Sequence, residues 1–177
     1  MQTNKGIGRS RRCVKRTVSD RGGLHPENDR NEALEKGLKK EIAIGIDPDV
    51  EKSGLALYNR KSGDLEIRTM DILDLLDMLR ILNRKEETVV YVEAGWLNKP
   101  SNFRDHRSSR AREYMAKAVG RNEQVGKIIL QACQRYGIDC IPVRPKRSKT
   151  SPQMFEKLTG IKTRNQEKID AAMMVID

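Results

Sequence analysis

The sequence predicts a mixed α/β fold built on a five-stranded sheet, and three patterns lead to this prediction. Residues 42–46 form a continuous apolar run that is too short for a helix, as expected for a central strand covered on both faces. Residues 65–70 alternate between apolar and polar side chains, which is typical of a strand in a hairpin. Apolar residues then recur at helical spacing over residues 72–83 and 111–136.

The first predicted strand ends on an acidic residue, Asp47. Pro48 follows it and lacks the N–H that a strand needs to continue its ladder. The next apolar run, residues 55–58, predicts an antiparallel second strand, and residues 65–70 pair with it as the third. Taken alone, Asp47 is also explained as the first residue of a turn.

A later predicted strand also ends on an acidic residue. After a helix that begins at the expected N-cap Asp71, the β-branched run of residues 88–92 leads directly to Glu93. Residues 138–143 complete the five strands. Because two apolar strands each end on a carboxylate, a chance explanation of Asp47 becomes weaker.

The long helix predicted for residues 111–136 ends at Gly137, which suits the left-handed conformation that often follows a helix. Gly120 and Gly126 lower its helical propensity, and we expect them to allow close approach of another backbone, either the sheet or DNA. The side of this helix that we expect to be buried consists of Tyr114, Met115, Ala118, Val125, Ile128, Ile129, Ala132 and Cys133.

Two further acids, Glu167 and Asp170, stand three residues apart in the last predicted helix, residues 165–177, and share one face of it. Singly they are ordinary for a helix start, where acids favour the positive end of the dipole. Together with Asp47 and Glu93, they predict a cluster of four carboxylates. Such a cluster needs positive charge, and with no His or Cys set for zinc the expected cofactor is Mg²⁺ or Mn²⁺. Two such ions about 4 Å apart can activate a water and steady the leaving 3′ oxygen during phosphodiester hydrolysis.

The composition favours a polyanionic partner. The 177 residues carry 35 Lys and Arg against 25 Asp and Glu, a net charge of +10, so nucleic acid is the first candidate. Residues 1–40 hold 11 basic and 5 acidic residues and too few apolar ones for a core. We expect them to be a disordered basic arm along phosphates, the alternative being a solvated tail without a specific role. Residues 41–177 are expected to form the folded domain.

Membranes and disulfides are not expected. The chain has no run of about 18 apolar residues and no hydrophobic signal core, so we expect no membrane span and a cytoplasmic protein. Its three cysteines, Cys13, Cys133 and Cys140, are odd in number and lack metal-type spacing, which fits reduced thiols.

Two segments combine features of nucleic-acid contact. The loop of residues 94–109 mixes aromatic with basic side chains, which suits base stacking and phosphate contact, although its aromatics are also explained as caps on the core. Residues 144–150 place four basic residues in seven directly after the fifth strand, where a solvated loop is the alternative. The predicted DNA-binding residues are Trp96, Lys99, Phe103, Arg104, Arg107, Arg144, Lys146, Arg147 and Lys149.

This order of elements resembles the ribonuclease H superfamily and, within it, the RuvC-type Holliday-junction resolvases. IGIDPDVEKSGLALYN is similar to the first motif of that family, VVYVEAGW to the second, and NQEKIDAAMMVI to its carboxy-terminal acidic helix. The resemblance covers residues 42–176 and implies a ribonuclease H-like fold. It also implies metal-binding catalytic roles for Asp47, Glu93, Glu167 and Asp170.

The same resemblance implies that Trp96 stacks at the junction and that Lys146 or Lys149 lies near the scissile phosphate. Family members act as homodimers that cut two strands symmetrically. Two positions depart from the family pattern, because Asp49 stands where glycine is frequent and Glu167 where Asp or His is usual. The extra methylene of Glu167 puts its role as a metal ligand in question.

The sequence therefore predicts a metal-dependent, structure-selective DNA endonuclease that resolves four-way junctions with two metal ions per active site. Two alternatives stay open. One is another ribonuclease H-like enzyme, either a nuclease for RNA–DNA hybrids or a transposase-like strand transferase. The other is a branched-DNA-binding protein without cleavage activity, in which the acids are structural.

Overall fold

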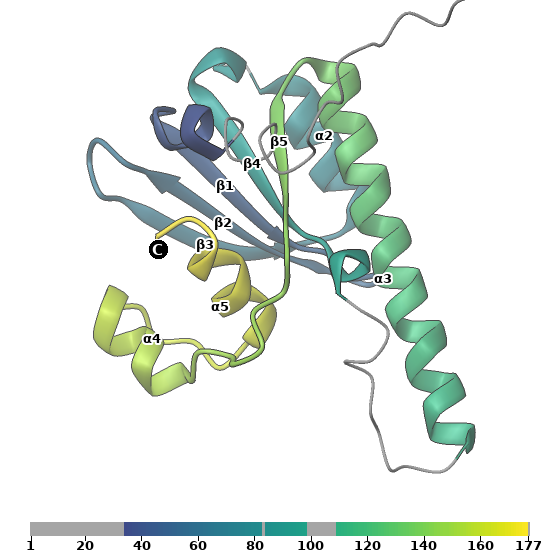
Figure 1. The fold of residues 1–177 in the computed structure, drawn as a ribbon. Coiled ribbons are helices and arrows are strands. Elements are labelled where there is room, and N and C mark those ends of the chain that lie inside the picture. The colour runs from purple at the N-terminus through teal and green to yellow at the C-terminus, as the bar shows by residue number, and fades with distance from the viewer. Residues whose placement is uncertain (1–33, 83, 99–108, 177) are drawn as a thin grey trace, which may run out of the picture.

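A five-stranded mixed sheet forms the centre of the molecule. The computed structural model describes residues 34–82, 84–98 and 109–176 (Figure 1). The strands lie in the order β3-β2-β1-β4-β5. β1 pairs antiparallel with β2 and parallel with β4, while β2–β3 is antiparallel and β4–β5 parallel. The strands are β1 (Ile42–Asp47), β2 (Ser53–Asn59), β3 (Leu65–Met70), β4 (Thr88–Glu93) and β5 (Asp139–Val143).

Helices cover both faces of this sheet, so the predicted α/β fold class is confirmed. On one face, Leu75 and Leu79 of α2 and Ile129 of α3 pack against the apolar side chains of β1 and β4. On the other face, Ile169 and Ala172 of α5 pack beside the sheet. The helices are α2 (Ile72–Ile81), α3 (Ser109–Tyr136), α4 (Pro152–Thr159) and α5 (Gln166–Met173), with short 3₁₀ turns at Lys85–Glu87 and Gly95–Leu97.

The close seat of α5 on β1 and β2 depends on two glycines. A Cβ added at Gly45 would lie 2.0 Å from the carbonyl oxygen of Ala171, and one added at Gly54 would lie 2.2 Å from that of Glu167. Any side chain at either position would force the helix away from the sheet. The two glycines therefore determine how near the acidic residues of α5 come to the end of β1.

Helix α4 was not predicted from the sequence. Its N-cap Ser151 accepts a hydrogen bond from the Met154 N–H, Pro152 occupies the first turn, and Gly160 ends it in the left-handed conformation at φ 74°. Phe155 is fully buried in the core between this helix and α5. The helix spans only 8 residues, which is too short for a clear helical period to stand out in the sequence.

The predicted buried side of α3 is wrong in its first half. Ile129, Ala132 and Cys133 are buried as expected, but Tyr114 is 69% exposed. Figure 1 shows the amino-terminal half of α3 extending beyond the edge of the sheet, away from the core of the described residues. Met115 is exposed as well, and so is Ile128 in the second half of the helix.

The folded part begins earlier than residue 41, the boundary expected from the sequence. Residues 34–38 form a helical turn, and Leu34 packs on the core cluster beneath α5. The Arg60 guanidinium fixes this turn by donating to the Gly37 and Lys40 carbonyl oxygens at 2.7 and 2.9 Å. Residues 1–33, which make up most of the predicted basic arm, lie outside the described part of the chain.

Two further observations bear on the expected environment. Across the described ranges, no helix combines the length and apolarity that crossing a bilayer requires. Cys133 and Cys140 are free thiols, as predicted, while Cys13 lies outside the described residues.

Candidate active site

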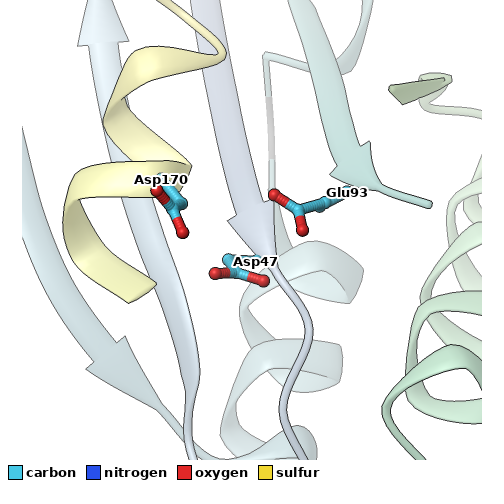
Figure 2. A group of neighbouring side chains, drawn as sticks. All are labelled: Asp47, Glu93 and Asp170. Carbon is cyan, nitrogen blue, oxygen red and sulfur yellow. The ribbon is translucent and has the colours of Figure 1, made fainter. Parts of the chain in front are cut away.

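Three carboxylates from three distant parts of the sequence converge at one edge of the sheet. Asp47 ends β1, Glu93 ends β4, and Asp170 lies on α5 (Figure 2). One carboxylate oxygen from each lies within 4.8 Å of the other two, and all three side chains are half-buried. Because β1 and β4 are parallel neighbours, with Ile46 opposite Val92, their carboxyl ends bring the two acids side by side.

Burial and the neighbouring carboxylates make Asp47 and Glu93 hard to ionise. Burial, reinforced by the Glu93 carboxylate, raises the pKa of Asp47 to about 8. Burial also raises the pKa of Glu93, with a smaller contribution from Asp170. Three carboxylates that share a half-buried site in this way are typical of a site for a hard divalent cation.

The Asp170 carboxylate is held by two partners. Its Oδ1 accepts a hydrogen bond from the Gln166 side-chain amide at 2.8 Å, and that amide also donates to the Thr150 carbonyl oxygen at 3.3 Å. Its Oδ2 pairs with the Lys149 ammonium. Sequence analysis missed the role of Gln166, although a Gln four residues before an Asp on a helix is a recognisable pair.

Glu167 lies outside the group of three. It occupies the first turn of α5, and burial, followed by the nearby Asp49 and Glu51 carboxylates, raises its pKa. The three-residue step from Glu167 to Asp170 advances about 4.5 Å along the helix. The influence of Asp49 and Glu51 shows that the Glu167 carboxylate lies near the β1–β2 loop, while Asp170 lies with Asp47 and Glu93.

The β1–β2 loop is itself fixed to α3. The Asn122 side-chain amide donates to Asp49 Oδ2 at 2.9 Å, and Asp49 Oδ1 accepts from the Glu51 N–H at 2.8 Å. Asp49, which stands where the resembled family often has glycine, therefore has a structural role here. Sequence analysis gave Asn122 no function, because nothing in the pattern of α3 links it to a loop 73 residues away.

A cleft of about 220 Å³ opens beside the acids. Its lining includes Asp47 and Glu93 from the sheet, Asn122 and Glu123 from α3, and Pro145 from the loop after β5. The cleft thus joins the carboxylates to the basic segment of residues 144–150. A second hollow of about 130 Å³ is lined among others by Arg144, Lys146, Lys149 and Asp170.

Of the predicted DNA-binding residues in the loop after Glu93, the structure describes only Trp96. Its indole is half-buried, and the Lys127 ammonium lies 5.6 Å from the ring centroid. A Cβ added at Gly126 would lie 2.9 Å from Trp96 Cζ3, so this glycine makes room for the indole, not for the sheet or DNA as we expected. Gly120 has nothing within 4 Å of its Cβ position. Lys99, Phe103, Arg104 and Arg107 lie outside the described residues.

The basic segment after β5, which is predicted to contact phosphates, is exposed. Arg144, Lys146 and Arg147 are all open to solvent, and Lys149 reaches from this segment to Asp170. The segment therefore presents positive charge directly beside the three carboxylates. Such an arrangement suits a phosphate that approaches the acids from this side.

The high pKa of Asp47 predicts an unusual pH dependence for the metal-free protein. Asp47 binds its proton more tightly when folded, with a pKa of about 8 against 3.8, so this contribution to stability is lost as pH rises through that range. We expect the melting temperature of Asp47→Asn to rise relative to wild type between about pH 5 and about pH 9 in EDTA. A difference that stays constant across this range would show that Asp47 titrates normally.

Comparison with known proteins gives a distant likeness among solved structures. No protein-family model matches this chain, and no curated protein matches it. Among solved structures, the chain is similar to T. thermophilus RuvC in complex with a Holliday junction substrate. The two are 16% identical with a TM-score of 0.45, and the match covers 75% of this chain and 88% of that one.

Proposed function

We propose that this protein is a metal-dependent DNA endonuclease that resolves four-way junctions. The observation that carries this proposal is the convergence of Asp47, Glu93 and Asp170 within 4.8 Å at the end of the parallel strands. A half-buried group of three acids is costly unless a cation compensates it. In a chain with a net charge of +10, the substrate that such a site suits best is a nucleic-acid phosphodiester.

The donor set fits Mg²⁺ or Mn²⁺, since all three side chains offer carboxylate oxygens. When bound, one or two such ions would lower the pKa of a water and stabilise the charge on the leaving oxygen. Asp47, Glu93 and Asp170 would hold them, and Gln166 keeps the Asp170 carboxylate oriented. Glu167 stays a predicted ligand, and its position beside the β1–β2 loop favours a secondary role.

The surroundings of the acids suit a strand of DNA. The cleft gives access to Asp47 and Glu93, and Arg144, Lys146 and Arg147 supply exposed positive charge next to it. These three residues would position the phosphates on either side of the bond that is cut. Lys99, Arg104, Arg107 and Phe103 are proposed to extend this contact.

The preference for a junction rests on the resemblance of the sequence motifs and on Trp96. Its half-buried indole lies next to the cleft-lining Gly95, where it would stack on a base exposed at the point of strand exchange. Resolution requires two symmetric cuts. We therefore propose that the protein acts as a homodimer, with one acid group for each of the two cleaved strands.

A substrate panel tests this function against its alternatives. Full-length protein with Mg²⁺ is incubated with a synthetic four-way junction, an RNA–DNA hybrid and a plain duplex of matched length. We expect paired cuts in the junction and little cleavage of the other two. Preferred cleavage of the hybrid would instead assign another ribonuclease H-like activity, and junction binding without any cleavage would assign a DNA-binding role.

A second prediction concerns residues 1–33, which hold 8 basic and 4 acidic residues. Deleting them should weaken DNA affinity and flatten its dependence on salt concentration, because fewer counterions are released on binding. The cleavage rate at saturating protein should stay nearly unchanged. The deletion should stop at residue 33, because the turn of residues 34–38 packs on the sheet and binds Arg60. Equal salt slopes for the two proteins would show that these residues do not contact DNA.

A further inference from the structure

Lys149 pairs directly with the acid group of Asp47, Glu93 and Asp170, through Asp170. Its ammonium lies on Oδ2 of Asp170, whose side chain is only 10% exposed, while the Lys149 side chain is 52% exposed. The lysine thus reaches a buried carboxylate from the solvent side. It comes from the segment after β5 and not from α5 itself.

The charge of Lys149 acts on the whole group. Besides pairing with Asp170, it lowers the pKa of both Asp47 and Glu93. Burial of Lys149 opposes its own charge, but the Asp170 carboxylate and its two neighbours outweigh that effect and raise the pKa of Lys149. The ammonium therefore partly neutralises the three carboxylates.

A divalent cation bound to these carboxylates would share Asp170 with the Lys149 ammonium. At such short range the two positive charges repel each other. We propose, resting on the proposed metal site, that Lys149 is a tethered counter-charge which the divalent cation displaces from Asp170. In the metal-free protein, Lys149 then stabilises the acid group. Once displaced, its ammonium lies within the basic segment of residues 144–150, where it is available to a DNA phosphate.

Direct metal binding tests this role. Mg²⁺ is titrated calorimetrically into full-length wild type and into Lys149→Met at about pH 9, where protons compete least with the cation. Removal of the competing charge should tighten Mg²⁺ binding on the order of 10-fold. Lys149→Arg keeps the charge and should stay near wild type. The matched control is Lys162→Met, which removes one exposed positive charge from the segment before α5 and should leave the affinity unchanged.

Two further measurements do not depend on cleavage. In EDTA, Lys149→Met should melt at a lower temperature than Lys162→Met, and saturating Mg²⁺ should raise the melting temperature of Lys149→Met by more than that of wild type. In wild type itself, amine-reactive labelling followed by mass spectrometry should show greater modification of Lys149 with Mg²⁺ than with EDTA, relative to Lys162. This last measurement stands even if Lys149→Met does not fold.

The outcomes separate this inference from the proposed function. If wild type binds Mg²⁺, Asp47→Asn loses that binding, and Lys149→Met binds with unaltered affinity, Lys149 is not a competitor and the inference is overturned while the metal site stands. Unchanged Lys149 labelling on addition of Mg²⁺ would overturn it in the same way. If wild type binds neither Mg²⁺ nor Mn²⁺, the metal site itself is wrong and the inference fails with it.

Discussion

Replacing Asp47 by asparagine is expected to abolish junction cleavage in Mg²⁺ while junction binding is kept or becomes tighter. The substitution preserves the shape of the side chain but removes one anionic ligand from a group of three carboxylates within 4.8 Å. Loss of one such electrostatic element costs about 100- to 1,000-fold in rate, and here it removes a ligand of the cation as well. Binding survives because the change also removes a negative charge that repels phosphate. Single-turnover cleavage and a binding titration on the same junction measure the two effects.

Glu167→Gln provides the matched comparison. It makes the same chemical change in the acid that lies toward Asp49 and outside the group of three. We expect a smaller loss of rate than for Asp47→Asn. An equal loss would restore the four-acid site predicted from the sequence. Full cleavage by Asp47→Asn would remove the metal assignment altogether.

Trp96→Ala is expected to lose about 1 to 3 kcal/mol of junction-specific binding free energy while binding to plain duplex hardly changes. The reason is that a half-buried indole can still offer a surface to an exposed base. A purely structural role predicts a different result, in which truncation lowers the free energy of unfolding by about 3 to 5 kcal/mol and depresses every activity together. Thermal unfolding run beside the binding titration distinguishes the two.

Substitutions at two glycines of α3 test the role of Trp96 without removing its side chain. Alanine at Gly126 would bring its Cβ to 2.9 Å from Trp96 Cζ3, which displaces the indole without removing it. Alanine at Gly120 meets nothing within 4 Å. Both changes raise the helical propensity by about 0.5 to 1 kcal/mol, so the difference between them reports on the indole. Junction preference should fall for Gly126→Ala only, and an equal preference in the two variants would place the recognition of junctions elsewhere.

The strands and their terminal acids were predictable because each depends on a local pattern. Residues 42–46 and 88–92 are apolar runs that end on a carboxylate, and the parallel pairing of β1 with β4 brings Asp47 and Glu93 together. A buried strand needs only its own residues to be recognised. The position of α5 cannot be recognised from its own residues alone, because it depends on the close approach of this helix to Gly45 and Gly54.

The remaining errors arise where distant contacts decide. The helical spacing of apolar residues in α3 does not show that the helix extends beyond the edge of the sheet. The pattern therefore predicts a buried Tyr114, although the core does not reach that residue. The partner of Asp170 on α5 is Gln166 and not Glu167, because the rotation of a short helix on the sheet decides which residue faces the acids. Arg60 likewise hydrogen-bonds to Gly37 and Lys40, which the composition places in the basic arm. These residues therefore belong to the folded domain.

The most direct measurement of the proposed function uses a supercoiled plasmid that extrudes a cruciform. The base of the cruciform is a four-way junction. Two paired cuts at this junction within one binding event convert the circular plasmid to a linear molecule. We predict linear product with ends at the base of the cruciform in Mg²⁺, none in EDTA and none with Asp47→Asn. A plasmid that stays supercoiled in both Mg²⁺ and Mn²⁺, or that is only nicked at scattered positions, would contradict a metal-dependent junction resolvase.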